Sequence, residues 1–73
     1  MALLTTLCNM SEENRKHYLM DNDDLCKFTI AELEEVIEYL GRDPHEFRCN
    51  SERMYMYIKE ACGCYTEEGN RWR

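Results

Sequence analysis

The sequence predicts an all-α fold, a small bundle of three to four helices built around a helix, an extended loop and a second helix. Apolar residues recur at helical spacing in three stretches, and strong start and stop residues bound two of them. No stretch alternates apolar and polar residues as a strand does. With 73 residues the chain is expected to form one small domain with a thin margin of stability.

The N-terminal elements are predicted to be short. In residues 1–10 three leucines recur at helical spacing, which predicts about one and a half amphipathic turns. Ser11 is a good N-cap, and the two glutamates after it complement the positive helix end, so we expect a helix over 11–20. The short polar residues of 21–24 then favour a turn, because their side chains compete for backbone hydrogen bonds.

The strongest local signal is a helix start at Thr29. Thr29 and Glu32 match a capping box, in which each side chain accepts a hydrogen bond from the other residue's backbone N–H. Phe28 and Leu33 hold the flanking positions of a hydrophobic staple. A helix is therefore predicted to begin here.

The stop signals of this helix are equally clear. We expect it to cover residues 30–40, with Gly41 as its left-handed stop and Pro44 beyond it. Residues 41–50 then form a connecting loop with one large apolar residue, Phe47, which is expected to tuck under the helices.

A further helix is predicted over residues 51–62, capped by Ser51 and stopped by Gly63. We therefore expect a single helical domain over 1–63 and a C-terminal tail over 64–73, of which residues 66–73 are expected to be mobile. The apolar positions in register predict the core residues Leu33, Ile37, Leu40, Phe47, Met54 and Ile58.

Several positions between residues 25 and 62 also match the pattern of a known module. They are Leu25, Thr29–Leu33, Tyr39–Gly41, a loop of about ten residues, and Ser51–Met54 leading to Ile58. This order resembles the helix–extended loop–helix module of the SAP family, which has relatives in the LEM and Rho N-terminal folds. The small size and the many cysteines and methionines also resemble small proteins of large DNA viruses.

The resemblance implies a candidate nucleic-acid site. SAP-family members commonly bind DNA through basic residues near the loop and second helix, usually including a lysine just before that helix. The loop here holds no lysine, so Arg48 and Arg53 are the cations that could stand in for it. The candidate contacts on this interpretation are Arg42, Arg48, Arg53 and Lys59.

The negative net charge of the chain argues against nucleic-acid binding. Fifteen acidic and nine basic residues give a formal net charge of −6, and such a field repels phosphate backbones. Nucleic acid is therefore a disfavoured partner. A third interpretation, mimicry of DNA by an acidic face, is weaker because the charges are not strongly segregated along the chain.

Five cysteines are an odd number, which excludes a fully paired disulfide framework within one chain and favours a reducing compartment. The first residues make a poor secretory signal, and no run approaches the roughly 20 apolar residues of a membrane span. We expect an intracellular protein of the cytoplasm or nucleus, or of a virion if the viral resemblance holds, with no membrane partner.

The best metal-ligand set is weak. A Cys-x-Cys pair is tighter than the Cys-x2-Cys spacing that zinc prefers, so we expect free thiols and no metal or other cofactor. The pair at the helix end, Cys62 and Cys64, is expected to be exposed and to react fastest with thiol reagents. The metal-ligand candidates are His45, Cys49, Cys62 and Cys64.

The function expected from these residues is noncatalytic. Thiol catalysis needs a cysteine beside a histidine, and nothing in the sequence brings His17 or His45 to one. We therefore expect a protein–protein interaction module or structural adaptor, with SAP-like nucleic-acid binding as the alternative. The partner would be another protein or a second copy of the chain. The candidate partner contacts are the aromatic residues Tyr55, Tyr65 and Trp72, although aromatic residues at this spacing also serve as core.

Overall fold

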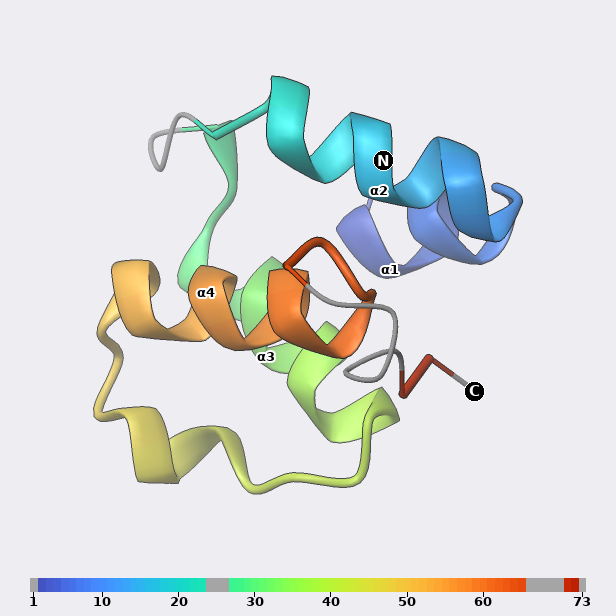
Figure 1. Ribbon diagram of the computed structural model, residues 1–73. Helices are drawn as coiled ribbons and strands as arrows, with labels where there is room; N and C mark the ends of the chain where they lie inside the picture. Colours follow the sequence, from blue (N-terminus) through green and yellow to red (C-terminus); the bar gives the residue numbers. More distant parts are fainter. Residues whose placement is uncertain (1, 24–26, 66–70, 73) are drawn as a thin grey trace.

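Helices account for all the regular secondary structure in the residues that the computed structural model describes, 2–23, 27–65 and 71–72 (Figure 1). They are α1 (Leu3–Cys8), α2 (Glu12–Asp21), α3 (Ile30–Tyr39), the short 3-10 helix η2 (Pro44–Phe47) and α4 (Ser51–Ala61). The predicted all-α fold class is confirmed. None of the described helices has the length and apolarity needed to cross a bilayer.

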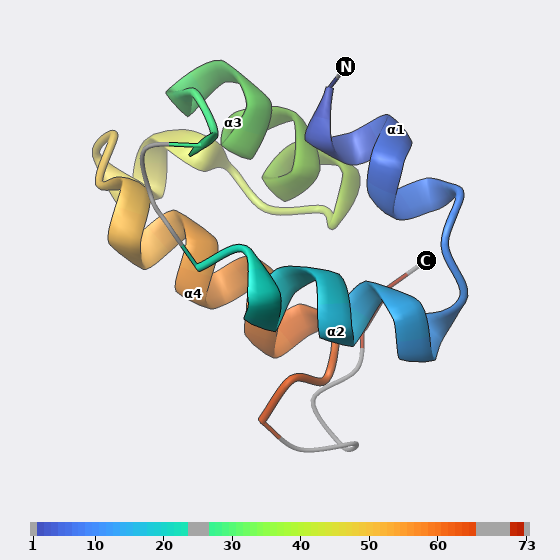
Figure 2. The same ribbon diagram turned by 90° about the horizontal axis from the view of Figure 1, so that it is seen from above.

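The helices are arranged as two pairs that share one core. α1 packs against α3, and α2 lies alongside α4, as the view from above shows (Figure 2). α3 and α4 also pack against each other, and η2 contacts both of them at the end of the bundle away from α2 (Figure 1). The outer face of α4 beside η2 is therefore not covered by another described helix.

The buried core is larger than the one predicted. Every predicted core residue is buried except Leu40, which follows the last residue of α3 and is only partly buried. Both N-terminal helices contribute buried leucines, so this half of the chain is part of the core and not an appendage. The buried apolar residues beyond the predicted set are Leu3, Leu7, Leu19, Val36, Tyr55, Ala61 and Cys62.

The predicted start of α3 is confirmed. The Thr29 hydroxyl accepts a hydrogen bond from the Glu32 backbone N–H at 3.2 Å, and the Glu32 carboxylate accepts one from the Thr29 N–H at 3.1 Å. This second bond lowers the pKa of Glu32. The Phe28 ring stacks on the Tyr55 ring, with centroids 5.7 Å apart, which fixes the chain entering α3 against α4.

α3 ends one residue earlier than predicted, at Tyr39. Gly41 adopts the left-handed conformation, with φ 88°, that a glycine after a helix C-cap provides. The Gly41 N–H bonds to the Glu38 carbonyl and the Arg42 N–H to the Ile37 carbonyl. These two bonds form a Schellman motif, so the helix stop is encoded locally.

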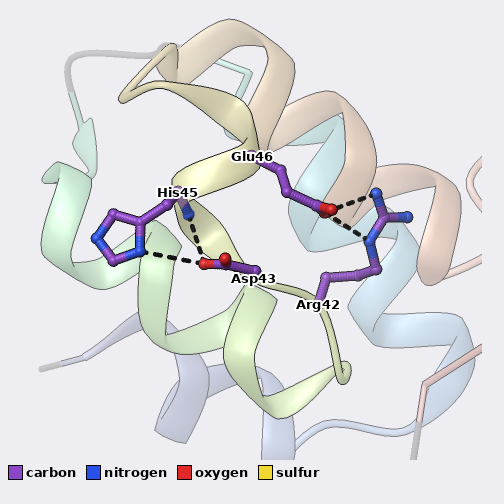
Figure 3. Close-up of polar contacts among 4 residues, drawn as sticks. All are labelled: Arg42, Asp43, His45 and Glu46. Atoms are coloured by element: carbon purple, nitrogen blue, oxygen red, sulfur yellow. Dashed lines mark hydrogen bonds and ion pairs between the residues drawn. The ribbon is translucent and has the colours of Figure 1, made fainter.

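The connection between α3 and α4 is not fully extended, because Pro44–Phe47 forms η2. Proline favours a helix start since its ring presets φ, and the Asp43 carboxylate caps it by accepting the His45 backbone N–H at 2.9 Å (Figure 3). That bond lowers the pKa of Asp43. Arg42 pairs with Glu46 at 3.0 Å across the same turn (Figure 3).

α4 is capped by Asn50 and not by Ser51, so the predicted N-cap is one residue off. The Asn50 side chain accepts the Arg53 backbone N–H at 3.1 Å. Arg48 and Cys49 both have positive φ, 51° and 58°, and this turn brings Asn50 into the extended backbone that an N-cap needs.

One buried arginine joins α1 to α2. Arg15 is 8% exposed, and its Nε donates to the Leu7 carbonyl at 3.1 Å while its Nη2 donates to the Met10 carbonyl at 2.8 Å. Since the last carbonyls of a helix lack partners within the helix, Arg15 satisfies the C-terminal end of α1 and the turn after it.

Part of the predicted tail packs against the domain. The Trp72 ring lies 4.6 Å from the Arg15 guanidinium and 5.1 Å from the Tyr39 ring, and the Arg71 N–H donates to the Ala61 carbonyl. The description of the tail as mobile is therefore wrong for these two residues. Residues 66–70 and 73 lie outside the described part of the chain.

Candidate interaction surface

The outer face of α4 carries an apolar residue that the core does not use. Met56 is 46% exposed, whereas its helical neighbours Met54 and Ile58 are fully buried. The flanking outward positions, one helical turn before and after Met56, are Glu52 and Glu60. This face is polar except at its centre.

Beside Met56 the surface is hollowed into a groove of about 300 Å³ between α4 and η2. Its aromatic wall is made by Phe47 and Tyr57, whose ring centroids are 5.4 Å apart. We call this the Met56 groove, and its lining residues are Phe47, Glu52, Arg53, Met56, Tyr57 and Glu60. η2 creates it by placing Phe47 under α4.

The charges of the groove are unpaired. Among the described residues, Glu52, Glu60 and Arg53 form no ion pair, although all three are exposed. Among the lining residues two carboxylates stand against one guanidinium, and the Arg71 guanidinium lies outside this set, 5.3 Å from the centre of the Tyr57 ring. An apolar centre with a polar, solvent-accessible rim is the arrangement that protein interfaces usually show.

On the other flank of Met56 a smaller hollow of about 150 Å³ is lined in part by an ion pair. Lys59 Nζ lies 2.8 Å from the Asp23 carboxylate, and the Lys59 side chain is almost fully buried. Burial works to lower the pKa of Lys59, but hydrogen bonds to Asp23 and Tyr65 outweigh it and the pKa is raised. Lys59 is therefore a charged group that ties α4 to the residue Asp23, which follows α2.

Of the three predicted partner contacts, Tyr55 is wrong. It is 2% exposed, and its hydroxyl lies 2.9 Å from the Leu19 carbonyl and 2.8 Å from the Asn22 carbonyl at the end of α2. Tyr65 is 51% exposed and remains a candidate contact. Trp72 is partly buried against Arg15 and Tyr39, which leaves only part of its ring for a partner.

Of the four candidate nucleic-acid contacts, two are engaged in ion pairs within the protein. Arg42 is held by Glu46, which raises the pKa of Arg42, and it also lies over the Tyr57 ring at 5.2 Å. Lys59 is buried with Asp23. Arg48 and Arg53 are exposed and remain available to an anion.

The candidate zinc ligands are not brought together. His45 and Cys49 are exposed, Cys62 is 1% exposed, and no group of three or more His, Cys, Asp or Glu residues in the described chain could hold a metal. Burial raises the pKa of Cys62 from 9.0 to about 12 and also raises the pKa of Cys64. The expectation that Cys62 is exposed and reacts fast is therefore wrong, since packing against the core covers its sulfur.

Met56 was missed from the sequence although a signal was present. A residue two positions from both Met54 and Ile58 falls on the opposite side of a helix, and Glu52 and Glu60 mark that side as polar. An apolar residue in such a position is a candidate contact. The groove itself could not be predicted, because it depends on where η2 places Phe47.

Comparison of the chain with protein-family models, with curated proteins and with solved structures finds no match. The resemblance of residues 25–62 to the SAP module thus remains a prediction.

Proposed function

We propose that this protein is a noncatalytic interaction module that binds a partner protein through the Met56 groove. The observation that carries the proposal is the half-exposed Met56 beside a hollow with an aromatic wall. Methionine and aromatic side chains are enriched in protein interfaces, because they present large and adaptable apolar area. Covering this groove would remove that area from water.

The roles of the ionisable side chains support a noncatalytic function. Arg15 and Tyr55 donate to backbone carbonyls, and Lys59 is paired with Asp23. Catalytic groups normally have pKa values near the working pH, whereas burial moves the pKa of Cys62 far above it. These groups hold helices together.

The experiment is site-specific photocrosslinking. A photoreactive amino acid replaces Met56 in one variant and Glu35, an exposed residue of α3 outside the groove, in a matched control. We expect the Met56 variant to give a discrete, nuclease-resistant adduct with another protein in extracts of the source cells, and the Glu35 variant to give none. Adducts of equal yield at both positions would contradict the proposal.

Two other outcomes would point to the alternatives. An adduct between two copies of the chain would indicate self-association, and a nuclease-sensitive adduct would indicate nucleic-acid binding. We expect the affinity of the protein for duplex DNA to be weak and to fall steeply between low and physiological salt. Submicromolar affinity at physiological salt, lost when Arg48 and Arg53 are neutralised, would replace the present proposal with the SAP-like one.

A further inference from the structure

We propose that the occupant of the Met56 groove is a cationic segment of a partner protein, with one apolar anchor side chain flanked by lysines or arginines. This inference rests on the proposed function and specifies the chemistry of the partner. Its basis is the placement of two unpaired carboxylates around an apolar hollow.

The hollow selects an apolar anchor. Met56, Tyr57 and Phe47 supply its apolar lining, and the volume of about 300 Å³ suits a large aliphatic or aromatic side chain and not a whole folded element. An anchor that fills such a pocket is the usual centre of binding energy in an interface.

The rim selects positive charge on both sides of that anchor. Glu52 and Glu60 are eight residues apart on α4, which places them about 12 Å from each other along the helix axis with Met56 midway. Neither forms an ion pair within the described residues. Cations on either side of the anchor would therefore each find a carboxylate.

An acidic partner or a second copy of the chain fits less well. An acidic segment would bring like charges against both glutamates, which is the usual way that an interface rejects a wrong partner. A second copy would bring two more glutamates and a single Arg53, leaving carboxylates in excess. The formal net charge of −6 adds long-range attraction for a cationic segment.

The test uses a defined probe, a fluorescently labelled synthetic helical peptide with one leucine flanked by lysines four residues before and after it. A matched peptide carries glutamates in place of the lysines. Binding is measured by fluorescence anisotropy at low and at physiological salt. We expect the lysine peptide to bind, with affinity that falls as salt rises, and the glutamate peptide not to bind.

Matched variants locate the charge effect. Glu52→Lys with Glu60→Lys should weaken the lysine peptide about tenfold, because two attractions become repulsions. Glu35→Lys with Glu38→Lys makes the same change in net charge on exposed positions of α3 and should weaken it less than about twofold. Arg53→Glu should strengthen binding. Circular dichroism of each variant confirms that the helices are intact.

Three results would overturn the inference. They are equal weakening by the α3 control pair, binding of the glutamate peptide as tight as that of the lysine peptide, and binding unaffected by Met56→Ser in a folded variant. If the lysine peptide fails while photocrosslinking at Met56 still captures a protein, the groove binds a partner of other chemistry, and only the proposed function survives.

Discussion

The two halves of this chain hold their helices in different ways. In the C-terminal half, α3 begins at a capping box and ends in a Schellman motif, and both are made by residues within a few positions of each other. In the N-terminal half, the end of α1 is satisfied by Arg15 and the end of α2 by the Tyr55 hydroxyl. Both ends of α3 are therefore encoded locally, whereas the C-terminal ends of α1 and α2 also depend on side chains from outside their own helices.

Substitutions in the shared core should lower the free energy of unfolding the most. They test whether the two halves of the chain unfold together. Leu7→Ala and Leu33→Ala each remove a fully buried side chain and should each lower the free energy of unfolding by about 2–4 kcal/mol. Leu40→Ala, at a partly buried position, should cost less. Urea unfolding measures all three. An unchanged midpoint for Leu7→Ala would show that α1 is not part of the cooperative unit.

The next effect concerns the tertiary cap of α1. Arg15→Ala removes two hydrogen bonds from a charged donor to backbone carbonyls and should cost about 2 kcal/mol or more. Arg15→Lys should recover only part of this, because an ammonium cannot reproduce the fork of two donors. Hydrogen exchange should show faster exchange in α1 and little change in α3. Equal acceleration in both helices would remove the distinction between the halves.

A smaller effect, dependent on pH, is expected at Tyr55. Tyr55→Phe keeps the ring but removes the hydroxyl bond to the end of α2, and should cost about 1 kcal/mol at neutral pH. Tyr18→Phe, at a partly buried position of α2, is the matched control and should stay within about 0.5 kcal/mol of the wild type.

The sign of the pH effect follows from burial, which raises the pKa of Tyr55 and Cys62. Both groups must stay protonated in the folded state, so their contribution is complete below the ordinary values of 9.0 for Cys62 and 10.0 for Tyr55. It is lost as the pH rises above those values. Urea unfolding between pH 7 and 11 should show this loss, and Tyr55→Phe should reduce it. Identical pH profiles for the two proteins would contradict this role of the hydroxyl.

The order in which the cysteines react with a thiol reagent can be measured without any substitution. Cys8 in α1 and Cys49 before α4 are exposed and should react with a thiol reagent well before Cys62 in the folded protein. Mass spectrometry after timed labelling gives the order, and all the thiols should react readily in denaturant. Early labelling of Cys62 would show that the end of α4 opens more often than the core does. Cys26 lies outside the described residues.

The features that could be predicted from the sequence are those made by residues close together in the chain. The start of α3 at Thr29 and its stop at Gly41 depend on neighbouring residues, so their pattern is visible in the chain. The roles of Arg15 and Trp72 could not be seen, because an arginine in a polar helix and a tryptophan near the chain end look like surface residues. Their burial depends on distant groups meeting in space.

The same holds for the candidate surface. The outward position of Met56 could be predicted, because it follows from the periodicity of α4. The groove beside it depends on η2 folding back to place Phe47 against Tyr57, which local signals do not specify. Among the aromatic residues predicted to contact a partner, Tyr55 is wrong because its hydroxyl donates to backbone acceptors 33 and 36 residues away.

The distances along the chain between bonded groups also imply an order of assembly. Arg15 reaches carbonyls only 8 and 5 residues away, so the corner between α1 and α2 closes a short loop, and α3 and α4 are likewise joined by a short connection. The bonds that join α2 and the residues just after it to α4 span 36 residues from Tyr55 to Leu19 and 36 from Lys59 to Asp23. We therefore expect the α1–α2 corner and the α3–α4 hairpin to form early and these two halves to dock late, with their separation as the first large opening of the folded protein.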